Sequence, residues 1–195
     1  NDDTFVFIAD MHGGHVGERH FLVMPDRSRV WSSTLQNRVN AKTCDLKLII
    51  TDSCNVSVRR QKSSAAKRLK EWDPNRNGMA PVMEELFIWH TGLLHMNSSW
   101  PGQYAFVDNN SGSWFLGELF DYCSDNPTAR PNWWCMDRCM DRTMAERFQL
   151  AKSDNRLPYE ARNQKNLPCA AWTANGCLRL WLRNGINPLP TPKKL

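Results

Sequence analysis

The sequence predicts an α/β fold with a mostly parallel central sheet. Three apolar runs carry this prediction, and each reads as a buried strand: residues 5–9, 46–51 and 92–97. A helical pattern separates the first two runs, and the order strand, helix, strand implies a right-handed crossover between parallel neighbours. The chain has 195 residues, of which 41% are hydrophobic and 23% charged, which suits one domain with a sizeable core.

The first α/β unit occupies residues 4–54. Its elements are expected in the order strand, short strand, helix and strand, at 5–9, 21–24, 31–40 and 46–51. A glycine-rich turn follows the first strand, and Pro25-Asp26 breaks the chain before the helix. Trp31, Leu35 and Val39 are spaced by four, so they share one face and predict an amphipathic helix.

Residues 55–90 form a polar and basic segment. Turn-forming residues at 73–78 argue against one continuous element there. Shorter helical pieces are expected at 63–71 and 81–88.

Regular structure returns with the strand at 92–97 and a helix at 113–123, which Ser111 or Ser113 could cap. The apolar face of this helix is expected to consist of Phe115, Leu116, Leu119 and Phe120. Residues 127–195 are rich in Trp, Arg and Pro and show no usable period. We therefore expect a core at 1–126 and a C-terminal extension of unknown role at 127–195. Packing anchors for this extension are expected at Trp133, Trp134, Trp172 and Trp181.

Two reactive side chains follow the first two long strands. His12 comes directly before a glycine pair at the end of one strand, and Cys54 ends the other. Parallel neighbours deliver their carboxyl ends to the same edge of a sheet, where open α/β folds place their sites. A thiol and an imidazole brought together there form a nucleophile with its base. The leading hypothesis is a cysteine hydrolase.

Two carboxylates accompany this pair. Asp10 lies two residues before His12, and Asp52 lies two residues before Cys54. Side chains two apart on a strand share a face, so both carboxylates would line one wall beside the nucleophile. Burial and mutual repulsion disfavour two negative charges at this position. A cation bound between the carboxylates would offset this cost.

At this point the residues resemble the caspase-like cysteine peptidases. The motifs that carry the resemblance are His12-Gly13, Asp52-Ser53-Cys54, the run from Ser98 through Trp100 and Gln103 to Ala105, and Gly112-Ser113-Trp114-Phe115. They span about residues 4–123, and the Asp52-Ser53-Cys54 triplet is closer to metacaspases and bacterial caspase-like proteins than to animal caspases.

The resemblance implies a three-layer sandwich that lacks the family's first two strands. In that family, two strands and two helices precede the histidine strand. Without them the first strand of this sheet would be an edge with unpaired backbone groups. We therefore expect either an incomplete chain, such as a fragment or processed subunit, or another segment that covers this edge.

The resemblance also implies roles for the site residues. Cys54 would be the nucleophile and His12 its base, with the backbone N–H groups of Gly13 and Cys54 as the oxyanion hole. Asp10 and Asp52 would bind the residue before the cut, which predicts cleavage after Arg or Lys, although Asp10 replaces a small polar residue usual in the family. The resemblance places Ser98, Trp100 and Gln103 at the far wall of the substrate cleft.

Several alternatives stay open. Asn55-Val56-Ser57 replaces the family's usual His-Ser-Gly after the cysteine, so a catalytically inactive interaction scaffold is the second hypothesis. The basic segment 59–70 is either a self-processing site or a solvated surface, and we favour no nucleic-acid partner because the net charge of +5 is mild. His15 is a rival base, whereas the histidines expected to be structural or at the surface are His20, His90 and His95.

Cysteine usage and hydropathy set the remaining expectations. Seven cysteines form no compact disulfide framework, which favours reduced thiols and a cytoplasmic location. A zinc site built from Cys135, Cys139, Cys169 and Cys177 fits finger or ribbon spacing poorly. No acidic cluster for calcium follows Cys54, so we expect neither a metal nor another cofactor. No apolar run approaches the roughly 18 residues that a membrane span needs.

Overall fold

A computed structural model describes residues 3–55, 81–88, 90–108, 112–126, 128, 132–157, 159–162 and 171–175. Its main sheet has the strand order β1 (Thr4–Asp10), β5 (Leu46–Asp52), β6 (Gly92–Asn97) and β9 (Ala171–Asn175). The first three strands are parallel, and β9 runs antiparallel to β6. The predicted mostly parallel sheet is thereby confirmed.

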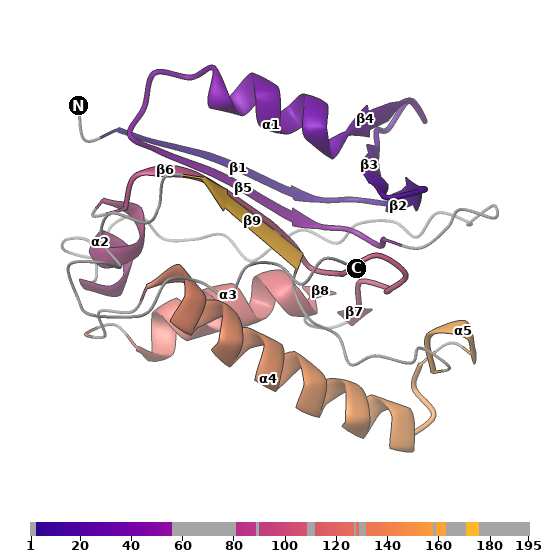
Figure 1. The fold of residues 1–195 in the computed structure, drawn as a ribbon. Helices are drawn as coiled ribbons and strands as arrows, with labels where there is room; N and C mark the ends of the chain where they lie inside the picture. The colour runs from indigo at the N-terminus through magenta and orange to yellow at the C-terminus, as the bar shows by residue number, and fades with distance from the viewer. Residues whose placement is uncertain are drawn as a thin grey trace.

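Helices cover both faces of this sheet (Figure 1). On one face lie α1 (Ser32–Asn40) and a small antiparallel sheet formed by β2 (Gly13–Val16), β3 (Arg19–Val23) and β4 (Arg29–Trp31). On the other lie α2 (Pro81–Phe87), α3 (Trp114–Asp125) and α4 (Trp133–Ser153). The short elements that remain are β7 (Val107–Asp108), β8 (Gly112–Ser113) and α5 (Tyr159–Arg162). The predicted three-layer arrangement is confirmed.

The register of the strands determines which apolar residues lie on each face of the main sheet. Val39 and Leu35 of α1 pack with Ile49, Leu93 and Phe7 on one face. On the opposite face, a larger cluster joins the sheet to α2, α3 and α4, with Leu48, Ile50, Leu94, Met96, Leu86, Leu116 and Met140 among its members. Both faces of β5 are covered, which explains the contiguous apolar run Leu48-Ile49-Ile50 in this strand.

The outer strand β1 is only half covered. Its residues Val6 and Ile8 are 40% and 43% exposed, although their partners in the register, Leu48 and Ile50, are fully buried. The helices on this face therefore cover β5 but stop short of β1. Among the described residues, β1 is an edge strand of the main sheet.

Helix α3 begins as the sequence predicts. The hydroxyl of Ser113 accepts a hydrogen bond from the Leu116 N–H at 2.9 Å, so Ser113 is the N-cap. Three residues of the predicted apolar face are buried, but the inclusion of Phe120 was wrong because its side chain is 43% exposed. Phe120 lies four residues after Leu116, at the margin of the face that packs on the sheet.

Helix α4 is the largest element that the sequence analysis did not predict. Along its 21 residues, Trp133, Met136, Met140 and Met144 join the cluster of the sheet, α2 and α3. Phe148 and Ala151 continue the buried stripe into a second cluster with Phe106, Trp114, Leu157 and Ala161. Trp133 acts as the expected packing anchor, since its indole N–H donates to the Leu86 carbonyl at 2.9 Å and its ring meets Phe87 edge to face. Residues on both sides of position 126 therefore share one hydrophobic cluster.

Several expectations fall on residues that the structure does not describe. The helical piece at 63–71, the basic segment 59–70, Cys169, Cys177 and Trp181 lie outside the described residues. The helical piece expected at 81–88 corresponds to α2. Among the described helices, none combines the length and the hydropathy that crossing a bilayer requires.

Candidate functional site

The two reactive side chains follow adjacent parallel strands. The register of β1 and β5 ends with Asp10 opposite Asp52, and the Met11 N–H then donates to the Asp52 carbonyl at 3.0 Å. His12 and Cys54 each follow their aspartate by two residues. The expected common edge of the two strands is therefore confirmed.

Gly13 brings the histidine segment against the cysteine segment. A Cβ atom at Gly13 would lie 2.8 Å from both the Cys54 carbonyl oxygen and the Ser53 Cβ. Only glycine allows this approach, because any other side chain would collide with backbone. The preceding residue is anchored as well, since the His12 carbonyl accepts a hydrogen bond from the Val23 N–H at 2.7 Å.

The thiol of Cys54 is protonated in this arrangement. Burial raises its pKa, the backbone of Ala105 acts in the opposite direction, and the charge of Asp52 raises it further. The sulfur lies 3.9 Å from the Ala105 carbonyl oxygen, and within the described part of the chain no hydrogen bond joins it to the His12 ring. Hydrogen bonds between catalytic groups are often long without substrate, so this geometry is compatible with a dyad that closes on binding.

Ser53, which precedes Cys54, forms hydrogen bonds through its N–H, its carbonyl and its hydroxyl. Its N–H donates to Ser98 Oγ at 3.1 Å, and its carbonyl accepts from Asn97 Nδ2 at 3.1 Å and from Ser99 Oγ at 2.7 Å. Its own hydroxyl donates to Asn97 Oδ1 at 2.6 Å. The end of β6 therefore fixes the backbone from which Cys54 projects. The sequence analysis did not identify Asn97 or Ser99, because their contacts depend on the pairing of β5 with β6.

Asp52 lies at the bottom of the site with 1% of its surface exposed. The hydroxyl of Ser98 donates to one carboxylate oxygen and that of Ser113 to the other. Burial raises the pKa of Asp52 to about 6, the two hydroxyl contacts oppose this shift, and the charge of Asp10 adds to it. Ser98, a predicted substrate-binding residue, therefore contacts the predicted specificity residue directly.

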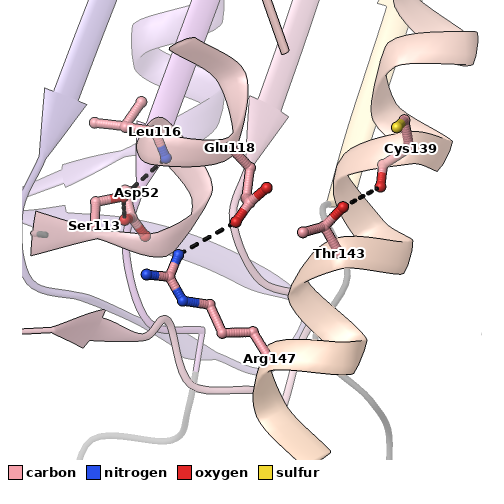
Figure 2. Close-up of polar contacts among 7 residues, drawn as sticks. All are labelled: Asp52, Ser113, Leu116, Glu118, Cys139, Thr143 and Arg147. Carbon is pink, nitrogen blue, oxygen red and sulfur yellow. Dashed lines mark hydrogen bonds and ion pairs between the residues drawn. The ribbon is translucent and has the colours of Figure 1, made fainter. Parts of the chain in front are cut away.

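Helix α3 begins beside this carboxylate, and α4 holds α3 in place. Figure 2 shows Ser113 at the start of α3 beside Asp52, and Glu118 of α3 paired with Arg147 of α4. The ion pair spans 3.2 Å, and the Arg147 guanidinium also lies over the Trp114 ring. Because the amino end of a helix carries partial positive charge, α3 presents a favourable environment to the Asp52 anion.

Asp10 lies at the exposed end of β1. Loss of solvation raises the pKa of its carboxyl, while the nearby charge of His12 acts in the opposite direction. Its position opposite Asp52 in the register gives the site two neighbouring carboxylates, one buried and one accessible.

The remaining predicted residues form a turn against the cysteine loop. The Trp100 N–H donates to Gln103 Oε1 at 3.0 Å, and the Gln103 N–H donates to the Trp100 carbonyl at 2.9 Å. The N–H of Asn55, directly after Cys54, donates to the Gln103 carbonyl, and the Asn55 carbonyl accepts from the Gly102 N–H. Gln103 is buried and holds this turn, and Trp100 is half-buried. A direct contact of either side chain with substrate stays a prediction.

The cysteines offer no metal site in the described part of the chain. No group of three or more His, Cys, Asp and Glu side chains there could hold an ion. The described cysteines, all with free thiols, are Cys44, Cys54, Cys123, Cys135 and Cys139.

Comparisons with known proteins support the fold. No protein-family model matches the sequence, and no curated protein matches it. The structure is similar to the crystal structure of caspase-1 from Spodoptera frugiperda, with a TM-score of 0.51 and 18% sequence identity. The match covers 87% of this chain and 59% of that caspase, so the chain spans less than two thirds of its length. At this level of identity the likeness shows the architecture: the chain has a caspase-like α/β fold, and its place among metacaspases stays a prediction.

Proposed function

We propose that this protein is a cysteine endopeptidase that cleaves peptide bonds after Arg or Lys through Cys54 and His12. The observation that carries the proposal is the paired end of β1 and β5. It sets Asp10 opposite Asp52 and packs Gly13 against the Ser53-Cys54 backbone. The caspase-like fold is consistent with this chemistry.

The proposed reaction has two halves. His12 accepts the thiol proton of Cys54 as the sulfur attacks the peptide carbonyl carbon, and it then donates that proton to the departing amine. Water, deprotonated by His12, attacks the resulting thioester, releases the carboxylic acid product and restores the thiol. Because burial favours the protonated thiol, proton transfer to His12 accompanies attack rather than preceding it.

Backbone donors would stabilise the negative oxygen of the tetrahedral intermediate. Gly13 and Cys54 supply them in this proposal. The Cys54 N–H has no hydrogen-bond acceptor among the described residues, so it is available for this role. The close approach of Gly13 to the Cys54 carbonyl brings the two donor segments together.

The carboxylates support a preference for a cationic residue before the cut. An ionised carboxylate offers about four lone-pair sites, and the hydroxyls of Ser98 and Ser113 use one on each oxygen of Asp52. An ammonium or guanidinium group would satisfy the remaining sites and offset the unfavourable burial of this charge. Asp10 would contribute a second, more accessible negative charge.

Fluorogenic peptides that differ only in the residue before the scissile bond test the proposal. We expect release of the fluorophore from the Arg and Lys peptides, little from an Asp peptide, and none with the Cys54→Ala variant. Activity that persists in Cys54→Ala would point to a contaminating peptidase. A preference for Asp would contradict the proposed role of the two carboxylates.

The second candidate is an inactive interaction scaffold. It is favoured by the raised pKa of Cys54 and by the lack of a hydrogen bond to His12 among the described residues. A chloromethyl ketone on an arginyl peptide distinguishes the two candidates, because it alkylates a nucleophile assembled around its cation. Labelling of Cys54 supports the peptidase, whereas a folded protein left unlabelled supports the scaffold. Self-processing within 59–70, outside the described residues, stays part of the peptidase proposal.

A further inference from the structure

A histidine outside the proposed dyad contacts the residue before the nucleophile. His20 lies on β3, and its Nε2 atom is 3.1 Å from Ser53 Oγ. Its Nδ1 atom is 2.6 Å from Ser32 Oγ, at the start of α1. The ring also interacts with the backbone of Cys54, so His20 joins the β2–β3 hairpin to both residues of the Ser53-Cys54 segment.

The surrounding hydrogen bonds fix the tautomer of this ring. Asn97 Nδ2 faces the carbonyl oxygens of Ser53 and Ser99, so it donates and Asn97 Oδ1 must be the accepting atom. The Ser53 hydroxyl therefore uses its only proton toward Asn97 Oδ1. Ser53 Oγ can then only accept from His20, which places the proton on Nε2. By the same logic Nδ1 of the neutral ring accepts from the Ser32 hydroxyl.

The ring is neutral under physiological conditions. Burial lowers the pKa of His20 to about 4, the backbone of Cys54 acts in the opposite direction, and His15 lowers the pKa further. The deduced tautomer is therefore the state in which the protein would work.

The position of His20 links the two proposed oxyanion donors. Gly13 lies on β2, opposite Leu22 of β3, two residues from His20. Cys54 follows β5 of the main sheet and is connected to that hairpin through Ser53. The two donor segments belong to different sheets, so their relative placement depends on contacts that cross between them.

We propose that His20 is a positioning residue of the candidate active site, which holds Ser53 through its Nε2–H so that the Cys54 N–H stays aligned with Gly13 toward the developing oxyanion. This inference rests on the proposed function. Because the oxyanion forms only during reaction, loss of the contact should lower kcat. It should leave KM nearly unchanged, because the carboxylates that bind the substrate cation are untouched.

A pair of substitutions separates this role from general support of the fold. His20→Phe keeps the ring volume and removes the donor, and we expect kcat to fall about 10- to 100-fold with KM changed less than about twofold. His20→Gln keeps an N–H donor at similar reach and should restore most of the activity. Alkylation of Cys54 by iodoacetamide needs no oxyanion donor, so its rate should stay within about twofold in both variants.

His90→Phe is the matched control. His90 is also buried with a lowered pKa, but it lies before the amino end of β6, where its Nδ1 contacts the Glu85 carbonyl at 2.7 Å. This variant should keep kcat near that of the unmodified protein. Should His20→Phe fail to fold, Ser53→Ala removes the acceptor instead and should show the same loss of kcat. Equal losses in the His90 variant, no rescue by Gln, or unchanged kcat in His20→Phe would overturn the inference.

A measurement without substrate keeps this test independent of the proposed function. In the unmodified protein, the ¹⁵N chemical shifts of the His20 ring should show the Nε2–H tautomer, and His20→Phe should shift the backbone amide resonance of Cys54. An absence of peptidase activity alone would contradict the proposed function. A different tautomer or an unmoved Cys54 amide would contradict the positioning role, whether or not the protein is a peptidase.

Discussion

At the scale of single residues, the charge of Asp52 acts in two directions. In the proposed function it would favour a cationic substrate, yet it also raises the pKa of the Cys54 thiol and so disfavours the thiolate. A bound Arg or Lys side chain would neutralise that charge and relieve the second effect. The correct substrate would therefore assist ionisation of the thiol that attacks it.

Asp52→Asn should consequently change thiol reactivity and peptidase activity with opposite signs. We expect iodoacetamide to alkylate Cys54 faster at neutral pH, because the pKa of the thiol falls when the charge is removed. Cleavage of Arg peptides should drop about 10- to 100-fold in kcat/KM, since a charge-assisted contact with substrate is lost. Mass spectrometry of the peptide that contains Cys54 measures the first effect, and fluorogenic kinetics measure the second.

Asp45→Asn provides the comparison. Asp45 lies exposed just before β5, at the opposite end of that strand from Asp52. The Asp45→Asn substitution removes the same charge without touching the site, so the rates of Cys54 alkylation and of peptide cleavage should both stay unchanged. If Asp52→Asn lowered both rates together, the carboxylate would be supporting the fold rather than controlling charge at the thiol.

The pH dependence of cleavage provides a second prediction at this scale. The pKa of Asp52 is about 6, above the ordinary value, so the carboxylate is ionised above that pH and neutral below it. The kcat/KM for Arg peptides should therefore fall about tenfold between pH 7 and pH 5 through this group alone. Dividing the profile of the unmodified protein by that of Asp52→Asn isolates the effect. A ratio that is flat across this range would contradict it.

Short local patterns in the sequence mark the candidate site residues. His12, Gly13 and Cys54 each follow an apolar run, and the structure places the two segments in contact. His20 carried no such mark, because its contact with Ser53 depends on the return of the β2–β3 hairpin. The hydroxyl contacts of Asp52 escaped prediction for the same reason, since they join three separate elements.

At the scale of elements, α4 shows how a buried helix can escape sequence analysis. The buried stripe of α4 consists largely of methionines at 136, 140 and 144, together with Trp133. A stripe of leucines would have been easier to recognise in the sequence. Arginines and aspartates between the methionines dilute the apolar signal. Strands β1, β3, β5 and β6 and helix α1 were predicted because their apolar residues are contiguous or regularly spaced. In contrast, β2 was expected to be a turn, and β9 depends on pairing with β6.

Met140→Ala tests the contribution of α4 to the core. Met140 is 1% exposed within the cluster that includes strands β5 and β6, so truncation leaves a cavity and should lower the free energy of unfolding by about 2–5 kcal/mol. Leu150→Ala on the same helix is the matched control, because Leu150 is 62% exposed and should cost less than about 0.5 kcal/mol. Urea unfolding followed by tryptophan fluorescence measures both. Equal small effects would mean that α4 contributes little to the core.

At the scale of the whole molecule, buried histidines should make the fold sensitive to acid. Burial lowers the pKa of both His20 and His95 to about 4, from an ordinary value of 6.5. Between pH 4 and pH 6.5, these histidines bind protons in the unfolded chain but not in the folded chain. Stability therefore declines as the pH falls from 6.5 toward 4. Asp52 acts with the opposite sign. Its folded pKa of about 6 exceeds the ordinary 3.8, so the folded chain binds a proton first and stability rises over that part of the range.

The pKa shifts of His20 and His95 together destabilise the fold in acid more than the shift of Asp52 stabilises it. We therefore expect the free energy of unfolding to fall by a few kcal/mol between pH 7 and pH 4.5. His95→Gln tests the balance. His95 is buried and contacts Gln36 through Nδ1 at 2.6 Å, and a neutral amide there removes one of the groups that bind protons on unfolding. As the pH is lowered from 7 to 4.5, the urea midpoint should then fall less in the variant than in the unmodified protein. This holds whatever the difference in stability between the two proteins at pH 7. Parallel profiles would show that His95 is not a source of the acid sensitivity, and stability that increases toward pH 4.5 would show that Asp52 dominates the titration of the folded chain.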